Sequence, residues 1–222
     1  MRIIQGQRIT EITAAEFAAL HNGFAAIHID VGTGSGRFIL QNAKKNTDVF
    51  YIGIDPAADS MKETAYKAQK YFRQSKRVCN AMFIVTAIEN IPDKLYGMAD
   101  SISVMLPWGS LLSGMVTADP QILQPLRTLG RADTDFDAII GYDEYREEAE
   151  KKRRSLPTLS PEYLHSLSDT YASCGIAITK IEEISNAHLK QLPSDWARKL
   201  GHGMQRVMYR LQGKYSGSML RS

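Results

Sequence analysis

Short apolar runs alternate with longer helical patterns through most of this chain, and that alternation limits the folds it can adopt. The strand-like runs lie at 24–31, 50–54, 82–85, 101–106, 136–141, 176–181 and 207–211. A helix is predicted at 58–74 and helical segments between 111 and 129. Strands that alternate with helices form a mostly parallel sheet covered on both faces. Toward the end strand follows strand, which predicts an antiparallel hairpin at the sheet edge.

The 222 residues are the length of one large domain, and we expect a single domain over 1–222. Residues 1–12 are expected to form a hairpin around Gly6, and Thr13 with Glu16 forms a capping box that predicts a helix to His21. A helical insert is expected at 143–175, with helices at 145–154 and 161–174. A basic loop is expected at 186–206.

The composition is that of an ordinary globular protein, with 44% hydrophobic and 23% charged residues, which argues against disorder. The two cysteines, Cys79 and Cys174, have no metal-like spacing and favour a reducing compartment. The first residues do not read as a signal peptide, and the uncharged stretch 101–118 contains Pro107 and glycines. We therefore expect a cytoplasmic protein with no membrane segment and no metal.

A glycine-rich loop follows the first strand-like run, Asp30-Val-Gly32-Thr-Gly34-Ser-Gly36. Glycines let the backbone turn tightly and come close to a ligand, although such loops also occur as plain strand–helix turns. The carboxylate of Asp30 makes the motif more specific, because pyrophosphate sites hold anions with backbone amides and a helix N-terminus. A cationic ligand fits that carboxylate better. S-adenosylmethionine carries both a sulfonium and an ammonium group.

Two further acids follow the next strands. Asp55 ends the second strand, where an acid can accept hydrogen bonds from ribose hydroxyls; the alternative is that Asp55 only caps the next helix. Glu89 follows the third strand. Because ligands of open α/β sheets bind at the carboxyl ends of the strands, Asp30, Asp55 and Glu89 are expected to meet at one site.

Two tryptophans are candidates for binding a flat acceptor. Trp108 follows the fourth strand between Pro107 and Gly109, although it could equally fill a gap in the core. Trp196 lies in a polar, basic segment. Aromatic rings on either side of a pocket can hold a base that has been turned out of its helix, at about 1–3 kcal/mol for each stacked base.

Basic residues are clustered more than the net charge of +3 suggests. They gather at 62–77, 151–154 and 186–214. One such run is usually a solvated helix face, whereas three around one pocket are typical of a surface that follows phosphates. Lys67, Arg154 and Arg206 are the favoured phosphate ligands.

Five motifs occur in order along the chain: Asp30-Val-Gly-Thr-Gly, Tyr51-Ile-Gly-Ile-Asp-Pro56, Leu106-Pro-Trp-Gly-Ser-Leu-Leu112, Arg154-Ser-Leu-Pro157 and Trp196-Ala-Arg-Lys-Leu200. Together they resemble the aminoglycoside-resistance 16S rRNA adenine-N1 methyltransferases, the Kam/Npm group, over nearly the whole chain. The resemblance implies the Rossmann-like class I methyltransferase fold, a seven-stranded, mostly parallel sheet with an antiparallel edge strand and a short N-terminal hairpin. It also implies methyl transfer from S-adenosylmethionine to N1 of adenine-1408 in the 30S subunit, which confers resistance.

The resemblance also assigns site residues. Trp108 and Trp196 would clamp the adenine as the catalytic residues. The cofactor would be held by Asp30, Gly32, Thr33, Gly34, Asp55, Pro56, Ile88, Glu89, Leu106 and Ser110. The rRNA would be bound by Lys67, Arg154, Arg198, Lys199 and Arg206, with Ser194 ordering the Trp196 loop. Three positions depart from the family pattern, Ser35, Lys199 and Met204, and a lysine cannot reproduce a bidentate guanidinium contact.

The expected mechanism needs no acid–base pair, because the N1 lone pair attacks the methyl directly. The five histidines are therefore expected to be structural, and the protein to act as a monomer. Other activities remain open: a tRNA methyltransferase, a small-molecule methyltransferase, and an RNA-binding protein without activity. A nicotinamide dehydrogenase is the weakest alternative, since Asp30 is wrongly placed for a pyrophosphate.

Overall fold

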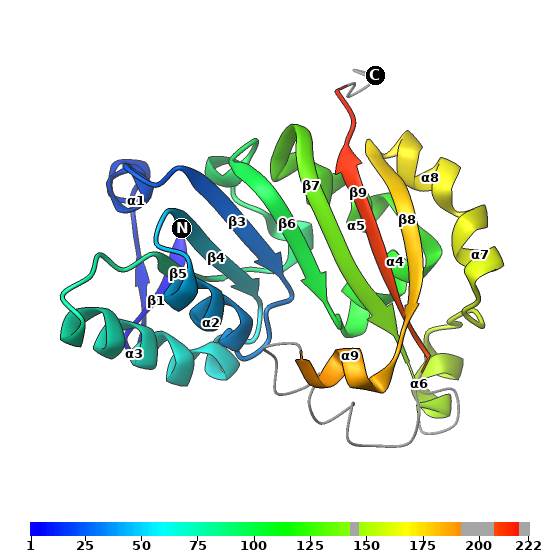
Figure 1. Cartoon of the computed structure of the whole chain (residues 1–222), viewed down its shortest axis with the longest axis horizontal. Helices are drawn as coiled ribbons and strands as arrows, with labels where there is room; N and C mark the ends of the chain where they lie inside the picture. The colour runs from blue at the N-terminus through cyan, green and yellow to red at the C-terminus, as the bar shows by residue number, and fades with distance from the viewer. Residues whose placement is uncertain (143–146, 192–206, 218–222) are drawn as a thin grey trace.

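The structure is a computed structural model that describes residues 1–142, 147–191 and 207–217. Within these residues one mixed sheet runs through the molecule in the order β2-β1-β5-β4-β3-β6-β7-β9-β8 (Figure 1). The strands are β1 Arg2–Gln5, β2 Arg8–Glu11, β3 Ala26–Val31, β4 Val49–Asp55, β5 Ala81–Val85, β6 Ala99–Met105, β7 Gly130–Gly141, β8 Ile176–Ile184 and β9 Met208–Tyr215.

The centre of the sheet is parallel. β3 pairs in parallel with both β4 and β6, and β5 and β7 extend the parallel run on either side. β9 is antiparallel to both β7 and β8, so the antiparallel strand lies one place in from the edge strand β8. The carboxyl ends of β3, β4, β5 and β6 consequently meet at one edge, as expected for an α/β sheet of this kind.

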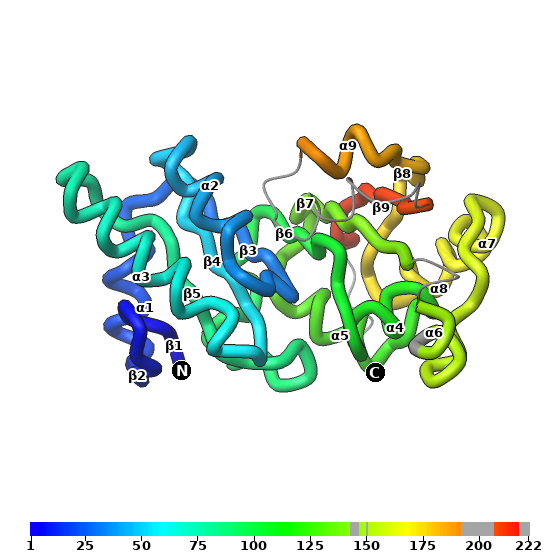
Figure 2. The backbone as a smooth tube through the Cα atoms, turned by 90° about the horizontal axis from the view of Figure 1, so that it is seen from below, coloured from blue at the N-terminus to red at the C-terminus, as the bar shows by residue number. Residues whose placement is uncertain are grey.

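Helices cover both faces of the sheet (Figures 1 and 2). The helices are α1 Ala14–His21, α2 Arg37–Lys45, α3 Ala58–Gln74, α4 Gly109–Thr117, α5 Pro120–Thr128, α6 Glu148–Arg153, α7 Pro161–Ser166, α8 Ser168–Ser173 and α9 Asn186–Gln191. On one face, α2 and α3 pack residues such as Ile39 and Met61 against Phe83. On the other, α4 and α5 contribute Leu112 and Leu123 to the larger core.

The N-terminal hairpin is part of this sheet. β1 pairs with β2 over four residues and with β5 through Ile3 and Ile84. The predicted capping box is present: the Thr13 hydroxyl accepts from the Glu16 amide at 3.2 Å, and the Glu16 carboxylate accepts from the Thr13 amide at 2.7 Å. The hairpin therefore extends the sheet by two strands, with β2 at the edge, and α1 packs Phe17 onto the core.

Several boundaries differ from the sequence prediction. β7 begins at Gly130 rather than at the predicted residue 136. Its first half is polar, which hid it in the sequence, and it is held by ion pairs of Arg131 with Asp100 and of Lys214 with Asp135. The helix predicted at 161–174 is divided at Leu167 into α7 and α8. The short helices α2 and α9 were not predicted. Among the described residues, no helix is long and apolar enough to cross a bilayer.

Candidate active site

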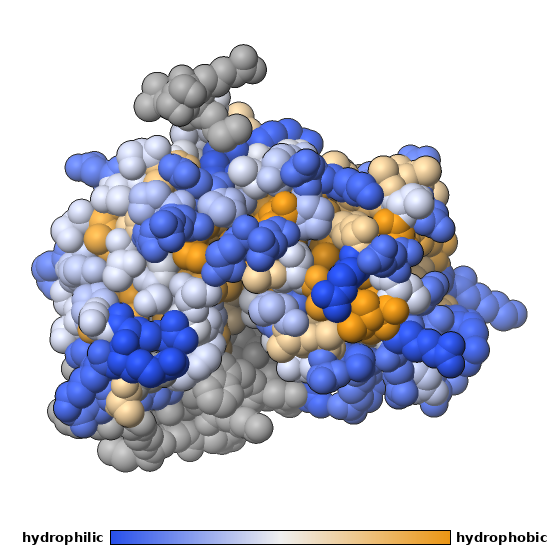
Figure 3. Space-filling model, turned by 180° about the vertical axis from the view of Figure 1, so that it is seen from behind, coloured by the Kyte–Doolittle hydropathy of each residue, from blue (hydrophilic) through white to orange (hydrophobic). Residues whose placement is uncertain are grey.

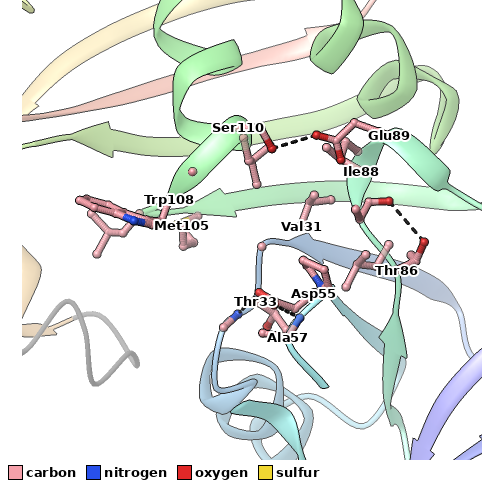
Figure 4. Close-up of a pocket in the computed structure, with 18 of the residues that line it drawn as sticks. Val31, Thr33, Asp55, Ala57, Thr86, Ile88, Glu89, Met105, Trp108 and Ser110 are labelled. Carbon is pink, nitrogen blue, oxygen red and sulfur yellow. Dashed lines mark hydrogen bonds between the residues drawn. The ribbon is translucent and has the colours of Figure 1, made fainter. Parts of the chain in front are cut away.

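A cavity of about 720 Å³ opens at the carboxyl edge of the sheet, between the loop after β3 and the start of α4 (Figure 4). This volume is within the usual range for small-molecule sites. Nearly all the residues predicted to hold the cofactor line it: Gly32, Thr33, Gly34, Asp55, Pro56, Ile88, Glu89, Leu106 and Ser110. Trp108 lies at the cavity as well.

The glycine loop is held mainly against the end of β4 by hydrogen bonds from its backbone amides. The amides of Gly32 and Thr33 donate to the carbonyl of Ile54, at 2.8 and 3.0 Å, and the Gly34 amide donates to Asp55 at 2.9 Å. The Gly36 amide donates to the carbonyl of Thr33. These four donors are therefore occupied, whereas a pyrophosphate loop needs its amides for the anion. The geometry argues against a dinucleotide and favours a cationic or neutral ligand.

Asp30 does not line the cavity. Its side chain is 1% exposed and lies beneath the glycine loop, where Oδ1 accepts a 2.6 Å hydrogen bond from the Ser103 hydroxyl. Burial raises the pKa of Asp30 to about 6, against the lowering effect of that hydrogen bond. A carboxylate at this depth acts on a bound ligand through its charge and through the loop above it, rather than by direct contact from the cavity wall.

Asp55 combines the two roles considered for it. Its Oδ1 accepts from the Ala57 amide at 2.8 Å, at the cap of α3, and Oδ2 accepts from the Gly34 amide. The same side chain lines the cavity, and carboxylate oxygens have further lone pairs for a ligand hydroxyl. Burial raises the pKa of Asp55, which the two backbone hydrogen bonds partly offset. Asp55 thus couples the glycine loop to the start of α3.

The far wall joins two segments that are distant in sequence. The Ser110 hydroxyl, in the first turn of α4, donates to Glu89 at 2.8 Å across this wall (Figure 4). On the loop side, the buried Thr33 side chain lies at Asp30, and its hydroxyl, like that of Ser103, lowers the pKa of that carboxylate against the effect of burial. With Asp55 and Glu89 as acceptors for ribose and amine groups, the cavity fits S-adenosylmethionine.

Trp108 is presented at the open side of the cavity with half of its surface exposed, at 50%. It directly precedes α4. Because half of its surface is exposed, it does not fill a gap in the core, the alternative considered for it. The loop is held at Leu106, whose φ of +56° is unusual for leucine and whose amide donates to the Ile139 carbonyl at 2.8 Å. Leu106 packs into a small apolar cluster with Leu189 of α9 and Met208 of β9.

Two of the predicted RNA ligands are described, and they lie on different sides of the cavity. Lys67 is exposed on α3 and forms an ion pair with Glu63 one turn earlier. Arg154 follows α6, and its guanidinium lies close to Gly109 beside the Trp108 loop. Within α6, Lys152 pairs with Glu148 at 2.6 Å, as its spacing predicts. Trp196, Ser194, Arg198, Lys199 and Arg206 lie outside the described residues, as does Met204.

Sequence reasoning missed other residues of the cavity wall. They lie at the carboxyl ends of parallel strands or in the loops and the first helical turn that follow, and they are Val31, Ser35, Ile54, Ala57, Thr86, Ala87, Met105, Gly109 and Leu111. Most carry apolar side chains or contribute backbone, so their residue types do not identify them. None of the described histidines lines the cavity.

Comparison with known proteins identifies the family. The family described as NpmA, 16S rRNA (adenine(1408)-N(1))-methyltransferase, matches residues 2–215. A 16S rRNA (adenine(1408)-N(1))-methyltransferase of Escherichia coli is 34% identical over 97% of this chain and 99% of its own.

Solved structures agree. A variant of the 16S rRNA (adenine(1408)-N(1))-methyltransferase from Catenulisporales acidiphilia, with cosubstrate SAM, has a TM-score of 0.87 and 29% identity, covering 100% of this chain and 99% of its own. The aminoglycoside resistance methyltransferase NpmB1 has a TM-score of 0.79 and 29% identity, covering 96% and 98%. The sheet, the glycine loop and the cavity are those of a class I methyltransferase, and this chain belongs to the 16S rRNA (adenine(1408)-N(1))-methyltransferase family.

Proposed function

We propose that this chain transfers a methyl group from S-adenosylmethionine to N1 of adenine 1408 of 16S rRNA, in the assembled 30S subunit, and so confers aminoglycoside resistance. The observation that carries the proposal is the half-exposed Trp108 at the mouth of a cavity that fits the cofactor. A tryptophan in that position can stack on a base brought to the cavity from outside.

The chain's residues do this chemistry by positioning. S-adenosylmethionine supplies, when bound, a methyl group on a positively charged sulfur. The negative charge of Asp30 beneath the loop and the oxygens of Asp55 and Glu89 favour a cationic ligand with ribose hydroxyls. Trp108 holds the adenine so that its N1 faces the cavity. A bond then forms between N1 and the methyl carbon while the carbon–sulfur bond breaks, and the positive charge moves to the base.

No proton has to be removed from N1, so no general base is required. Positioning of two reactants can contribute about 7–11 kcal/mol at its best. The methyl group and charge on the pairing edge of the adenine would block drugs that form hydrogen bonds there.

RNA contact is proposed for Lys67 and Arg154 among the described residues, with Arg198, Lys199 and Arg206 of the following segment. Figure 3 shows hydrophilic side chains spread over this face of the molecule, with groups of them low on either side. We further propose that the protein acts as a monomer in the cytoplasm, where 30S subunits are assembled. Trp196 is proposed as the second ring of the clamp.

Tritiated methyl transfer from S-adenosylmethionine tests the function directly. The acceptors are intact 30S subunits, naked 16S rRNA and bulk tRNA, and primer extension locates the methyl. We expect a stop at adenine 1408 with 30S subunits alone. Label in tRNA alone would replace the proposal with a tRNA methyltransferase, and cofactor binding without label in any RNA would favour a small-molecule acceptor. Light scattering of the purified chain tests the monomer.

A further inference from the structure

Behind the cavity, a row of polar side chains links Asp30 to a histidine. His28 and Asp30 project from the same face of β3, and their register partners on β6 are Ser101 and Ser103. The Ser103 hydroxyl lies 2.6 Å from Asp30 Oδ1 and 2.9 Å from His28 Nε2. The Ser101 hydroxyl lies 2.8 Å from His28 Nδ1. The four side chains therefore form one continuous chain of hydrogen bonds.

The direction of each hydrogen bond follows from the donors available. An ionised carboxylate only accepts, so Ser103 must use its single proton on Asp30. The oxygen of Ser103 must then accept from His28, which requires a proton on Nε2. A neutral imidazole has one N–H, so Nδ1 is an acceptor and takes the proton of Ser101. An ionised Asp30 thus specifies the Nε2–H tautomer of His28.

We propose that His28 is a positioning residue for the cofactor site: as the Nε2–H tautomer it supports Ser103, which in turn holds the Asp30 carboxylate ionised beneath the glycine loop. The inference rests on the proposed cofactor site. His28 touches neither the cavity nor the reacting atoms, and acts through Ser103 alone. Chains of hydrogen bonds polarise one another, so the imidazole N–H strengthens the donation to the carboxylate.

The surroundings of His28 keep the ring neutral and in place. Tyr51 of β4 and Phe38 of α2 lie against it, with ring centroids 5.4 and 5.9 Å away. Burial lowers the pKa of His28 to about 4, although Asp137 of β7 opposes this. Asp137 is itself paired with Arg210 of β9 through two hydrogen bonds of 2.7 Å. His28 is consequently a neutral donor at physiological pH.

The titration of Asp30 should make the cofactor affinity depend on pH. Burial raises the pKa of Asp30, and the nearby charge of Asp55 on β4 raises it further. A cationic cofactor prefers the ionised carboxylate, so affinity should rise with pH and level off above about 6. At pH 5 we expect an affinity about tenfold weaker than at pH 7.5, because only about a tenth of the ligand-free molecules carry an ionised Asp30 at pH 5.

Nitrogen-15 NMR of histidine-labelled protein reads the tautomer without any ligand. We expect the His28 pattern of a proton on Nε2 at pH 7.5. A proton on Nδ1, or a charged ring, would overturn the proposal. This measurement needs no substitution and no activity, so it is independent of the proposed function.

Calorimetric titration with S-adenosylmethionine from pH 5 to 8 then compares matched variants. Ser103→Ala should move the midpoint of the affinity curve upward by about one pH unit, and Ser103→Thr, which keeps the hydroxyl, should restore it. His28→Phe should move the midpoint in the same direction by a smaller amount. Ser101→Ala removes a hydroxyl one link further from Asp30 and serves as the control, with an unchanged midpoint.

A double variant decides whether His28 acts through Ser103. The His28→Phe change should add nothing to Ser103→Ala, because the link is already broken. Additive shifts, or a His28→Phe midpoint equal to that of the wild type, would make His28 a packing residue and overturn the proposal. A wild-type affinity that does not vary with pH would also overturn it while leaving the proposed function intact. No binding of S-adenosylmethionine at any pH would instead contradict the proposed function.

Discussion

Within the part of the chain that the structure describes, no cationic side chain lowers the pKa of the buried Asp30 carboxylate, and burial raises that pKa to about 6 from an ordinary 3.8. The folded chain therefore binds this proton more tightly than the unfolded chain. Stability from Asp30 is fully present below pH 3.8 and is lost as the pH rises to about 6, a change of about 3 kcal/mol. The charge proposed for cofactor binding thus destabilises the ligand-free fold at neutral pH.

Asp30→Asn should separate these two effects. The amide oxygen can still accept from Ser103, so the ligand-free variant should be more stable than the wild type at pH 8 by about 1–3 kcal/mol, and the difference should shrink toward pH 4. Its affinity for S-adenosylmethionine should fall at least about tenfold. Urea unfolding at several pH values and calorimetry measure both. Asp133→Asn, at an exposed carboxylate on β7, is the control; a less stable Asp30→Asn at pH 8 would contradict the argument.

The Trp108 side chain is half exposed to solvent rather than buried in the core. Trp108→Ala should leave cofactor affinity within a few-fold and reduce kcat/KM for 30S subunits by about 5- to 150-fold, the loss of one stacked base at about 1–3 kcal/mol. Trp108→Phe should recover part of the rate. A matching loss of cofactor affinity would show that the ring is instead part of the cofactor wall.

Among the elements, the loop between β3 and α2 depends on two glycines in different ways. Gly36 has φ of +71°, and a Cβ there would lie 2.4 Å from the buried ring of Phe83. Gly34 has φ of +56° with no atom within 4 Å. Gly36→Ala should therefore cost about 2–4 kcal/mol in urea unfolding, from strain and overpacking, and Gly34→Ala only about 1 kcal/mol. Equal losses would contradict the clash.

The two glycine variants should also differ in ligand binding. Gly34 lines the cavity, so the added methyl occupies space that the cofactor needs. At a temperature where both variants are folded, Gly34→Ala should weaken S-adenosylmethionine binding at least as much as Gly36→Ala. Calorimetry makes the comparison.

The elements also show which parts of the fold a sequence can predict. Helix α3 was predicted with its bounds, because its apolar residues recur at helical spacing between clear ends. The first half of β7 was not predicted, because Arg131, Asp133 and Asp135 do not show the apolar alternation of a strand. Arg131 and Asp135 are ordered by cross-strand partners that are distant in sequence.

For the site, Asp55 and Glu89 were predicted because each follows a strand at the same sheet edge, and Thr33 and Ser110 were predicted from the family resemblance, whereas Ser35 and Thr86 were missed. The sequence could not predict that Asp30 lies behind the wall, because depth depends on how the glycine loop folds over it. It also could not link His28 to Asp30, since the connection passes through Ser103 on another strand. Residues joined by packing rather than by motif are visible only in the structure.

For the whole molecule, the distribution of charge matters more than its sum of +3. α3 and α6, which carry two of the basic runs, lie toward opposite sides of the molecule (Figures 1 and 2). A surface that follows a phosphate backbone on both sides of one pocket can orient the RNA while a base enters the pocket. Affinity for the subunit should therefore depend strongly on salt.

Arg154→Glu tests this arrangement, because Arg154 lies beside the Trp108 loop on the α6 side. Losing one phosphate contact and gaining a repulsion should weaken 30S binding at least about tenfold near 0.1 M salt, and lower the slope of log affinity against log salt by about 1. Cofactor affinity should not change.

Lys94→Glu, an equal charge reversal on an exposed turn that leads toward the start of β6, is the matched control. Sedimentation with 30S subunits at several salt concentrations gives both slopes. Equal slopes for Arg154→Glu, Lys94→Glu and the wild type would remove Arg154 from the RNA contact surface.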